Sequence, residues 1–301
     1  MDAIAHGDRG VKIAAMIAEN ASIDSIVRWT RRRVTMTTML LAASLLLAST
    51  ARGQPAAVDE NAELAKKLSN PISDLVSVPF QLNWEQGVGP DDQTRFVLNV
   101  QPVMPFSLNP RWNLVARVIM PFVSQPPLFV GGQSVFGISD VLASFFLSPT
   151  SGSIVWGVGP VISLPSTTVR TLGSEKWSAG PTAVVLKQQG PWTYGALWNQ
   201  VWSFAGNTRR DDVSQMFLQP FLAYTTKGLI TITLQSESTA NWKADDHKWT
   251  VPVNVLFSKL SSFGTFPASY TIGFGGFVTS PEIGPDWKLR VALTILMPRK
   301  R

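Results

Sequence analysis

The sequence contains no cysteine and only two histidines. Without cysteine the chain can form no disulfide, no thiolate metal site and no thiol nucleophile. Beyond residue 53 the only histidine is His247, which follows Asp245 and Asp246. A metal site needs roughly three or four converging ligands, so we interpret this group as a solvated loop and expect no metal.

Charged residues are also scarce, at 15% against 45% hydrophobic ones in a chain of 301 residues. This composition is too apolar for a disordered protein. The formal net charge is +6, and half of it falls in the first 53 residues. The remainder shows no basic stripe with interleaved aromatic residues, so we expect no nucleic-acid partner.

Patterns typical of enzymes are missing as well. A Ser–His–acid triad would depend on His247, which lies in an expected loop far from any serine elbow. Gly273, Gly275 and Gly276 form a glycine-rich run inside a strand pattern. A nucleotide fingerprint needs a helix after such a run, and none is expected here. We therefore expect no catalytic residue, no cofactor and no enzymatic activity.

Residues 1–53 have the features of an N-terminal extension and a signal peptide. The basic block Arg31–Arg33 precedes the apolar run Met36–Ala51, and Ala51 and Gly53 are small residues two positions apart. This is the order of a secretory signal. A membrane-spanning helix takes about 20 apolar residues, more than this run supplies, so cleavage is favoured over anchoring. We expect residues 54–70 to form a short segment that lies in the periplasm or threads the barrel, and 71–301 to form a β-barrel.

Apolar and polar residues alternate with a period of two through most of residues 71–301. Trp249, Val251 and Val253, for example, are separated by single residues that would point to the opposite face. A strand places successive side chains on opposite faces, so each such segment has one apolar and one more polar face. The expected strands are 72–86, 94–106, 111–124, 137–148, 153–165, 175–188, 192–205, 213–226, 228–241, 248–260, 267–278 and 287–298.

The connections between these segments alternate between short turns and longer, more charged loops. Outer-membrane barrels have short periplasmic turns, longer extracellular loops and an even strand count. Lipid cannot satisfy backbone polar groups, so a sheet in lipid must close on itself. The sequence therefore predicts an all-β fold, a closed antiparallel transmembrane β-barrel of about twelve strands, surrounded by the lipid of a Gram-negative outer membrane.

The positions of the tryptophans support a membrane barrel, whereas prolines inside the expected strands argue against regular strands there. Tryptophan favours the bilayer interface, and seven tryptophans fall at expected strand ends, namely Trp84, Trp112, Trp177, Trp192, Trp242, Trp249 and Trp287. Proline removes a hydrogen-bond donor from a strand, so we expect bulges or kinks where it occurs. Such prolines are Pro79, Pro102, Pro121, Pro160, Pro181, Pro220 and Pro252.

Several stretches resemble a family of bacterial outer-membrane proteins named for the meta-pathway of phenol degradation, whose members are often labelled "transporter". The matching stretches are Lys66–Gln81, Gln101–Trp112, Trp156–Pro165, Gly173–Ser203, Leu218–Thr226 and Trp249–Ser258. The resemblance implies an outer-membrane barrel and passage of small molecules, including aromatic ones. It supplies no catalytic residues. Barrel proteins often end on an aromatic residue that assists insertion, whereas this chain ends on Met297 to Arg301.

The polar face of the expected strands would line the barrel lumen. Barrels of about eight strands are filled by side chains and those of about sixteen hold an aqueous channel, so twelve strands leave open both a passive channel for small solutes and a plugged structural or ligand-binding barrel. A soluble secreted β-protein is a more distant alternative. The candidate lumen residues are Gln81, Asn83, Glu85, Arg95, Asn99, Gln101, Asn113, Arg117, Asn199, Gln215, Phe217, Gln219, Gln235, Glu237, Asn254 and Arg290.

Overall fold

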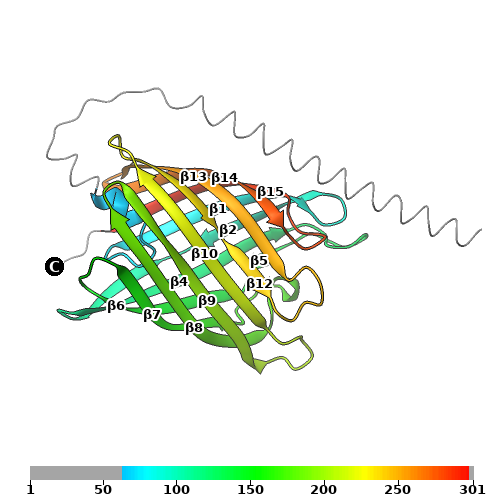
Figure 1. The fold of residues 1–301 in the computed structure, drawn as a ribbon. Coiled ribbons are helices and arrows are strands. Elements are labelled where there is room, and N and C mark those ends of the chain that lie inside the picture. Colours follow the sequence, from blue (N-terminus) through cyan, green and yellow to red (C-terminus); the bar gives the residue numbers. More distant parts are fainter. Residues whose placement is uncertain (1–62, 298–301) are drawn as a thin grey trace, which may run out of the picture. The chain divides into compact units, whose positions relative to one another are not determined.

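The computed structural model describes residues 63–297, and the expected signal peptide lies outside this range. Nearly all of the described chain is β-structure (Figure 1). The strands are β1 (Val76–Val88), β2 (Gln93–Val100), β3 (Val103–Asn109), β4 (Trp112–Gln125), β5 (Val135–Ile138), β6 (Val141–Pro149), β7 (Val155–Leu164), β8 (Lys176–Gln189), β9 (Trp192–Gly206), β10 (Ser214–Thr225), β11 (Ile230–Ser236), β12 (Ser238–Asn241), β13 (Trp249–Phe263), β14 (Phe266–Thr279) and β15 (Trp287–Met297).

These segments form a closed antiparallel barrel of twelve strands, as the alternation predicted. The pairs β2 and β3, β5 and β6, and β11 and β12 each make up one interrupted strand. Every strand pairs with the next along the chain, and β15 returns to β1 in unbroken register from Val76↔Met297 to Gln86↔Trp287. Closure leaves no sheet edge with unpaired backbone groups, which is the condition for a sheet in lipid.

The three interruptions lie opposite prolines of neighbouring strands. By the flanking registers, the break at Gln101 faces Pro79, the break at 139–140 faces Pro121, and the break at Glu237 faces Pro252. A missing N–H weakens the ladder on the facing strand. Pro102 lies in the first break itself. The expected irregularity is confirmed at Pro252, where the register shifts, and at Pro121, whose flanking registers differ by one residue. At Pro79 and Pro102 the flanking registers are continuous, so the expectation of a bulge is wrong there.

The expectation of a bulge is wrong at Pro160 and Pro181. At Pro220 the strand itself is regular, and only the facing strand ends. Pro160 and Pro181 pair with each other in an unbroken stretch of β7 and β8. Pro220 pairs regularly with Ala196 of β9 and faces the end of β11 on its other side. A proline loses one donor but keeps its carbonyl acceptor, so a ladder held on both sides tolerates a single loss.

The short turns lie at the same rim of the barrel as the start of its first strand and the end of its last strand. Turns after β3, β6, β8, β10 and β13 lie at the rim where β1 begins and β15 ends, and the longer connections lie at the other rim. Following the architecture of outer-membrane barrels, the first rim is periplasmic and the second extracellular. Among residues 63–297, no helix is long and apolar enough to cross a membrane.

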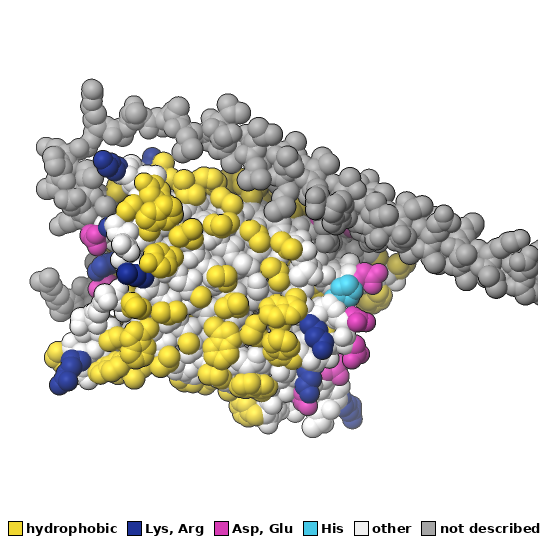
Figure 2. Space-filling view, in the orientation of Figure 1, with side chains coloured by type: hydrophobic (Ala, Val, Ile, Leu, Met, Phe, Trp, Pro, Cys, Tyr) yellow, Lys and Arg dark blue, Asp and Glu magenta, His cyan; other side chains and the backbone are white. Residues whose placement is uncertain are grey.

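The apolar faces of the strands point outward. Figure 2 shows hydrophobic side chains across the barrel wall, with charged side chains gathered toward its two ends. Leu82, Val158, Ile272 and Val291 are exposed on this wall, whereas inward neighbours such as Asn83 are buried. Buried polar and exposed apolar side chains are the reverse of a soluble protein, so the surface requires lipid.

Aromatic pairs mark both rims of the apolar wall. Trp84 and Phe96 lie 5.6 Å apart between ring centroids at the extracellular rim. Trp112 and Trp156 lie 5.9 Å apart at the periplasmic rim, in an edge-to-face arrangement. Indole rings prefer the boundary between hydrocarbon and water, so these pairs form the two aromatic girdles predicted from the strand ends.

Candidate functional site: the barrel lumen

The candidate site is the enclosed interior, where alternation brings the polar faces together. Gln81 pairs with Asn99, Glu85 with Arg95, Phe217 with Asn199 and Gln235 with Asn254 on adjacent strands. All sixteen residues selected from the sequence occupy inward positions of this register. Seven of them line an inner cavity, namely Gln81, Gln101, Arg117, Gln219, Gln235, Glu237 and Arg290.

An outer cavity lies toward the extracellular rim. Its volume is about 520 Å³, against about 230 Å³ for the inner cavity near the periplasmic rim. Of the sixteen residues, it is lined by Arg117, Asn199, Gln215 and Phe217, so Arg117 alone borders both cavities. The remaining candidates, which border neither cavity, are Asn83, Glu85, Arg95, Asn99, Asn113 and Asn254.

A charge cluster centred on Glu237 crosses the lumen. Arg290 of β15 donates to both carboxylate oxygens of Glu237, at 2.9 and 2.6 Å. Lys288 donates to the same carboxylate at 3.0 Å, and Arg290 Nε donates to the side-chain oxygen Oδ1 of Asn83 at 2.8 Å. A bidentate arginine–carboxylate pair is short, strong and geometrically specific. The cluster therefore ties β15 and β1 to the break between β11 and β12.

Two further arginines of the lumen differ in their partners within the described chain: Arg95 forms an ion pair and Arg117 does not. Arg95 of β2 lies 2.6 Å from Glu85 of β1. Arg117 of β4 instead donates one hydrogen bond, at 2.8 Å, to the side-chain oxygen of Gln101. Glu237 acts on Arg117 electrostatically without contact. Among residues 63–297, no carboxylate lies in ion-pair distance of Arg117.

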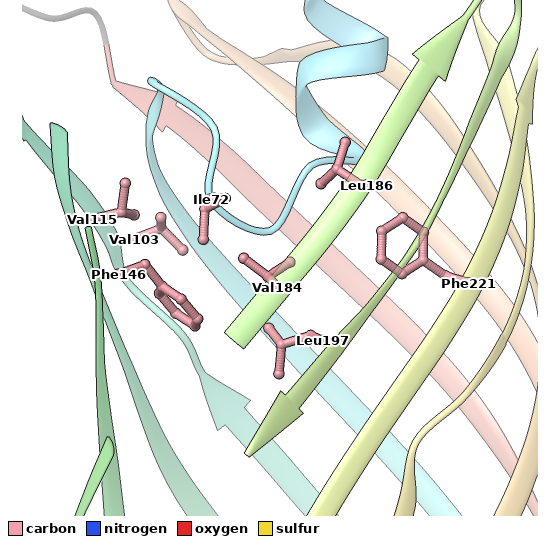
Figure 3. Close-up of a cluster of buried hydrophobic side chains, with 8 residues drawn as sticks. All are labelled: Ile72, Val103, Val115, Phe146, Val184, Leu186, Leu197 and Phe221. Carbon is pink, nitrogen blue, oxygen red and sulfur yellow. The ribbon is translucent and has the colours of Figure 1, made fainter. Parts of the chain in front are cut away.

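The periplasmic mouth is occupied by residues 63–75, which precede β1. They form a short helix over 63–68 followed by turns. Ile72 at the end of this segment projects between two barrel walls (Figure 3). It belongs to a buried apolar cluster with Val103, Val115, Phe146, Val184, Leu186, Leu197 and Phe221. We call residues 63–75 the plug.

Polar contacts hold the plug in place beside this cluster. The Gln188 amide of β8 donates to the Lys66 carbonyl at 2.9 Å. Within the plug, Asn70 accepts the backbone N–H of Ile72 at 3.0 Å, and Lys67 pairs with Asp74 at 3.0 Å. Gly157 leaves room for Ile72, because a Cβ there would lie 3.0 Å from its terminal methyl. The plug therefore closes much of the periplasmic end.

The loop between β7 and β8 covers part of the outer cavity. It contains the short 3-10 helix η2 (Arg170–Leu172), and residues 171–174 line the cavity. Ser174 donates through its backbone N–H and its hydroxyl to Asp140, both at 2.7 Å. Arg210 of the next extracellular loop donates to the Gly173 carbonyl at 2.6 Å. The two loops are thus fastened to each other and to the break between β5 and β6.

Two carboxylates in these loops have lowered pKa values. Hydrogen bonds from Asn207 and then Arg170 lower the pKa of Glu175 below its ordinary value of 4.5. A hydrogen bond from Lys176, together with its charge, lowers the pKa of Asp212. In each case the bonds favour the ionised form, because a cation or an N–H donor stabilises a carboxylate more than a carboxylic acid.

Acidification is therefore expected to loosen the 165–175 loop. Both carboxylates have a folded-state pKa below the unfolded value, so the stability they contribute is fully present above the unfolded pKa and is lost as pH falls through the folded pKa. Amide exchange of residues 165–175, corrected for the intrinsic rate, should accelerate between about pH 5 and about pH 3. Glu175→Gln should already exchange faster at neutral pH and lose part of this pH dependence; an unchanged profile would contradict the assignment.

Sequence reasoning left open whether residues 54–70 enter the barrel, and it missed most of the apolar part of the lumen. Apart from Phe217 it assigned apolar residues to the lipid face, yet Val184 and Leu186 point inward while Val185 between them faces lipid. The available signal was the unbroken apolar run at 183–186, in which both faces of a strand are apolar. Lys288 was also missed, although it shares the inward register of Arg290.

Comparison with known proteins places the fold. No family model matches the chain, and no curated protein matches it in sequence. The COG4313 outer membrane channel from Pseudomonas putida F1 is similar in structure, with a TM-score of 0.57 and 15% identity over 74% of this chain and 94% of that one. The NanC porin has a TM-score of 0.49 and 7% identity over 74% and 100%. The likeness to the first of these shows the fold, a closed outer-membrane β-barrel, and the apolar wall agrees with that membrane.

One expectation from the sequence is corrected by these comparisons. We expected no enzymatic activity, but outer membrane phospholipase A from Escherichia coli also has a similar barrel, with a TM-score of 0.42 and 11% identity over 79% of this chain and 98% of that one. Barrels of this architecture therefore include an enzyme, and the fold does not exclude one. At this TM-score the likeness assigns no reaction to the chain.

Proposed function

We propose that this protein is an outer-membrane channel for passive passage of small molecules. The observation that carries the proposal is the pair of cavities enclosed by the closed barrel, which meet at Arg117. A lumen lined by polar groups and charges of both signs selects solutes by size and charge. The solute's own gradient across the membrane is the driving force.

Aromatic and hydrophobic molecules are the solutes we favour. The outer cavity places apolar side chains, among them Ile119, Leu142 and Phe217, beside polar ones such as Asn199 and Gln215. Sites for small molecules combine a mainly apolar lining with a few polar groups that orient the ligand. The resemblance to the phenol meta-pathway family supports the same class of solute, and we propose membership of that family.

A plugged structural or ligand-binding barrel is the second candidate, and one observation favours it. Ile72 is buried among side chains of the barrel wall, and the plug to which it belongs lines the inner cavity at the periplasmic end, as an obstruction there requires. The channel proposal requires that this contact opens at times, whereas the plugged barrel requires that it does not.

Conductance and solute entry distinguish the two candidates. In planar bilayers the purified protein is expected to give discrete conductance steps, and in proteoliposomes it should admit phenol faster than protein-free vesicles do. Gln215→Trp places a bulky ring in the outer cavity and should lower both signals. Val185→Trp introduces the same ring on the lipid face, where Val185 is 51% exposed, and should leave them unchanged.

Absence of steps in both the intact protein and a variant lacking residues 63–75 would contradict conduction and favour the plugged barrel. Equal currents in the two tryptophan variants would mean that the outer cavity is not on the conduction path. Folding of each variant is checked by the shift in gel migration on boiling.

A further inference from the structure

The charges of the lumen do not balance. The inward positions carry the cations Arg95, Arg117, Lys288 and Arg290 against three carboxylates, Glu85, Glu237 and Asp140. Glu85 is taken by Arg95, and Glu237 is shared by Arg290 and Lys288. Among these groups cations exceed carboxylates by one, in a confined space whose walls focus the field, which attracts anions.

Arg117 is the cation whose hydrogen-bonding capacity is least used. A guanidinium has five N–H donors in a planar fork. Arg117 uses one of them for Gln101, and no other hydrogen bond to it is made by residues 63–297. Because Arg117 lines both cavities, its remaining donors face enclosed space that a solute can enter. This fork matches the two oxygens of a carboxylate.

Apolar side chains surround the space above Arg117. On the outer-cavity side these are Ile119, Leu142, Leu197 and Phe217. The cavity volume of about 520 Å³ falls within the range of small-molecule sites, roughly 300–1,000 Å³. A molecule that combines one anionic group with an apolar body would place the first on Arg117 and the second against these side chains.

The other charged residue of the outer cavity, Asp140, does not oppose this arrangement. It lies at the level of Pro121, four residues from Arg117 along β4, a distance of about 13 Å. One carboxylate oxygen accepts two hydrogen bonds from Ser174, and the other is buried without a partner against the Gly173 backbone. Its hydrogen bonds thus come from the loop, at the end of the cavity away from Arg117.

We infer that the outer cavity binds small organic monocarboxylates with an apolar body, held through Arg117. The inference deepens the proposed function, on which its relevance to transport rests, by naming the charge class of the solute. Neutral molecules of the same shape use only the apolar wall, and organic cations are disfavoured by the excess positive charge of the lumen.

Equilibrium binding to the full-length protein in detergent tests the inference. Titration calorimetry compares benzoate with benzyl alcohol and with the benzylammonium ion, which have a similar ring and differ in charge. Benzoate is expected to bind best. Arg117→Gln should weaken benzoate by about tenfold to a hundredfold, the usual effect of losing a charge-assisted hydrogen bond, and leave benzyl alcohol unchanged. Lys259→Gln removes the same charge from an exposed outward position and should change nothing.

A second variant tests the site without removing the arginine. Ser144 pairs with Arg117 across β6 and β4, so Ser144→Asp places a carboxylate next to the guanidinium and should also abolish benzoate binding. This variant decides the matter if Arg117→Gln fails to fold. The inference is overturned if benzoate binds no better than benzyl alcohol, or if both variants bind it as the intact protein does. Benzoate binding that depends on Arg117, without any conductance, would overturn the proposed channel alone.

Discussion

Removal of residues 63–75 is expected to raise the conductance of the barrel several-fold. The plug supplies Ile72 to the apolar cluster and lines the inner cavity, so its loss merges that cavity with the periplasmic mouth. The strands themselves begin at Val76 and pair with β15 from that residue onward, so the barrel does not need the plug for closure. Single-channel recordings in planar bilayers measure the effect.

A point variant separates the contact made by Ile72 from the bulk of the plug. Ile72→Ala removes a side chain that is 4% exposed, and such truncations cost about 2–5 kcal/mol. Here the cost falls on docking of the plug, so longer or more frequent openings are expected. Lys67→Ala is the matched control, because it removes only an exposed ion pair worth at most about 1 kcal/mol. Identical currents for the deletion and the intact protein would show that the plug is not the barrier.

Replacement of Glu237 by alanine is expected to destabilise the barrel strongly. Arg290 and Lys288, 3% and 4% exposed, would keep their charges inside the lumen without the carboxylate that joins them. Removing one partner of a buried ion pair costs about 3–5 kcal/mol, since the remaining charge is left uncompensated. Urea unfolding in lipid vesicles, followed by tryptophan fluorescence, measures the loss.

A double variant identifies the cause of that loss. In Glu237→Ala with Arg290→Met the uncompensated guanidinium is gone, so stability should recover part of the way toward the intact protein. Glu63→Ala removes a carboxylate from an exposed plug pair and should change stability by less than about 1 kcal/mol. If Glu237→Ala unfolds at the same urea concentration as Glu63→Ala, the cluster contributes little to the fold.

Most strands were predictable from sequence because their signal is local, but the first was expected from residue 72 and begins only at Val76, since residues 72–75 belong to the plug. The two faces of β1 and β15 differ residue by residue, as with Leu82 and Asn83, so alternation alone separates lipid from lumen. The turn lengths then fixed which rim is which. The breaks could be anticipated only in part, because a proline such as Pro252 disturbs the facing strand, and the identity of that strand depends on the barrel register.

The side-chain contacts inside the barrel could not be predicted from the local sequence pattern. Glu237 and Arg290 are 53 positions apart, and Ile72 packs on Phe146 only because the barrel closes around it. Alternation marks a residue as inward but not which inward residue it meets across the lumen. Alternation therefore selected both Arg117 and Glu237 as lumen residues. It could not show that Glu237 is held in ion pairs, whereas Arg117 has N–H donors that make no hydrogen bond within the described part of the chain.

The three breaks in the strands each set a polar side chain at a particular height of the interior. Gln101, the partner of Arg117, lies at the first; Asp140, which anchors an extracellular loop, at the second; and Glu237, which neutralises the cations of β15, at the third. Each lies opposite a proline of another strand. A substitution at Pro79, Pro121 or Pro252 therefore restores a backbone donor on one strand while displacing a side chain on its neighbour. Such substitutions can thus reshape the interior twice over, since Pro79 also lines the inner cavity and Pro121 the outer one.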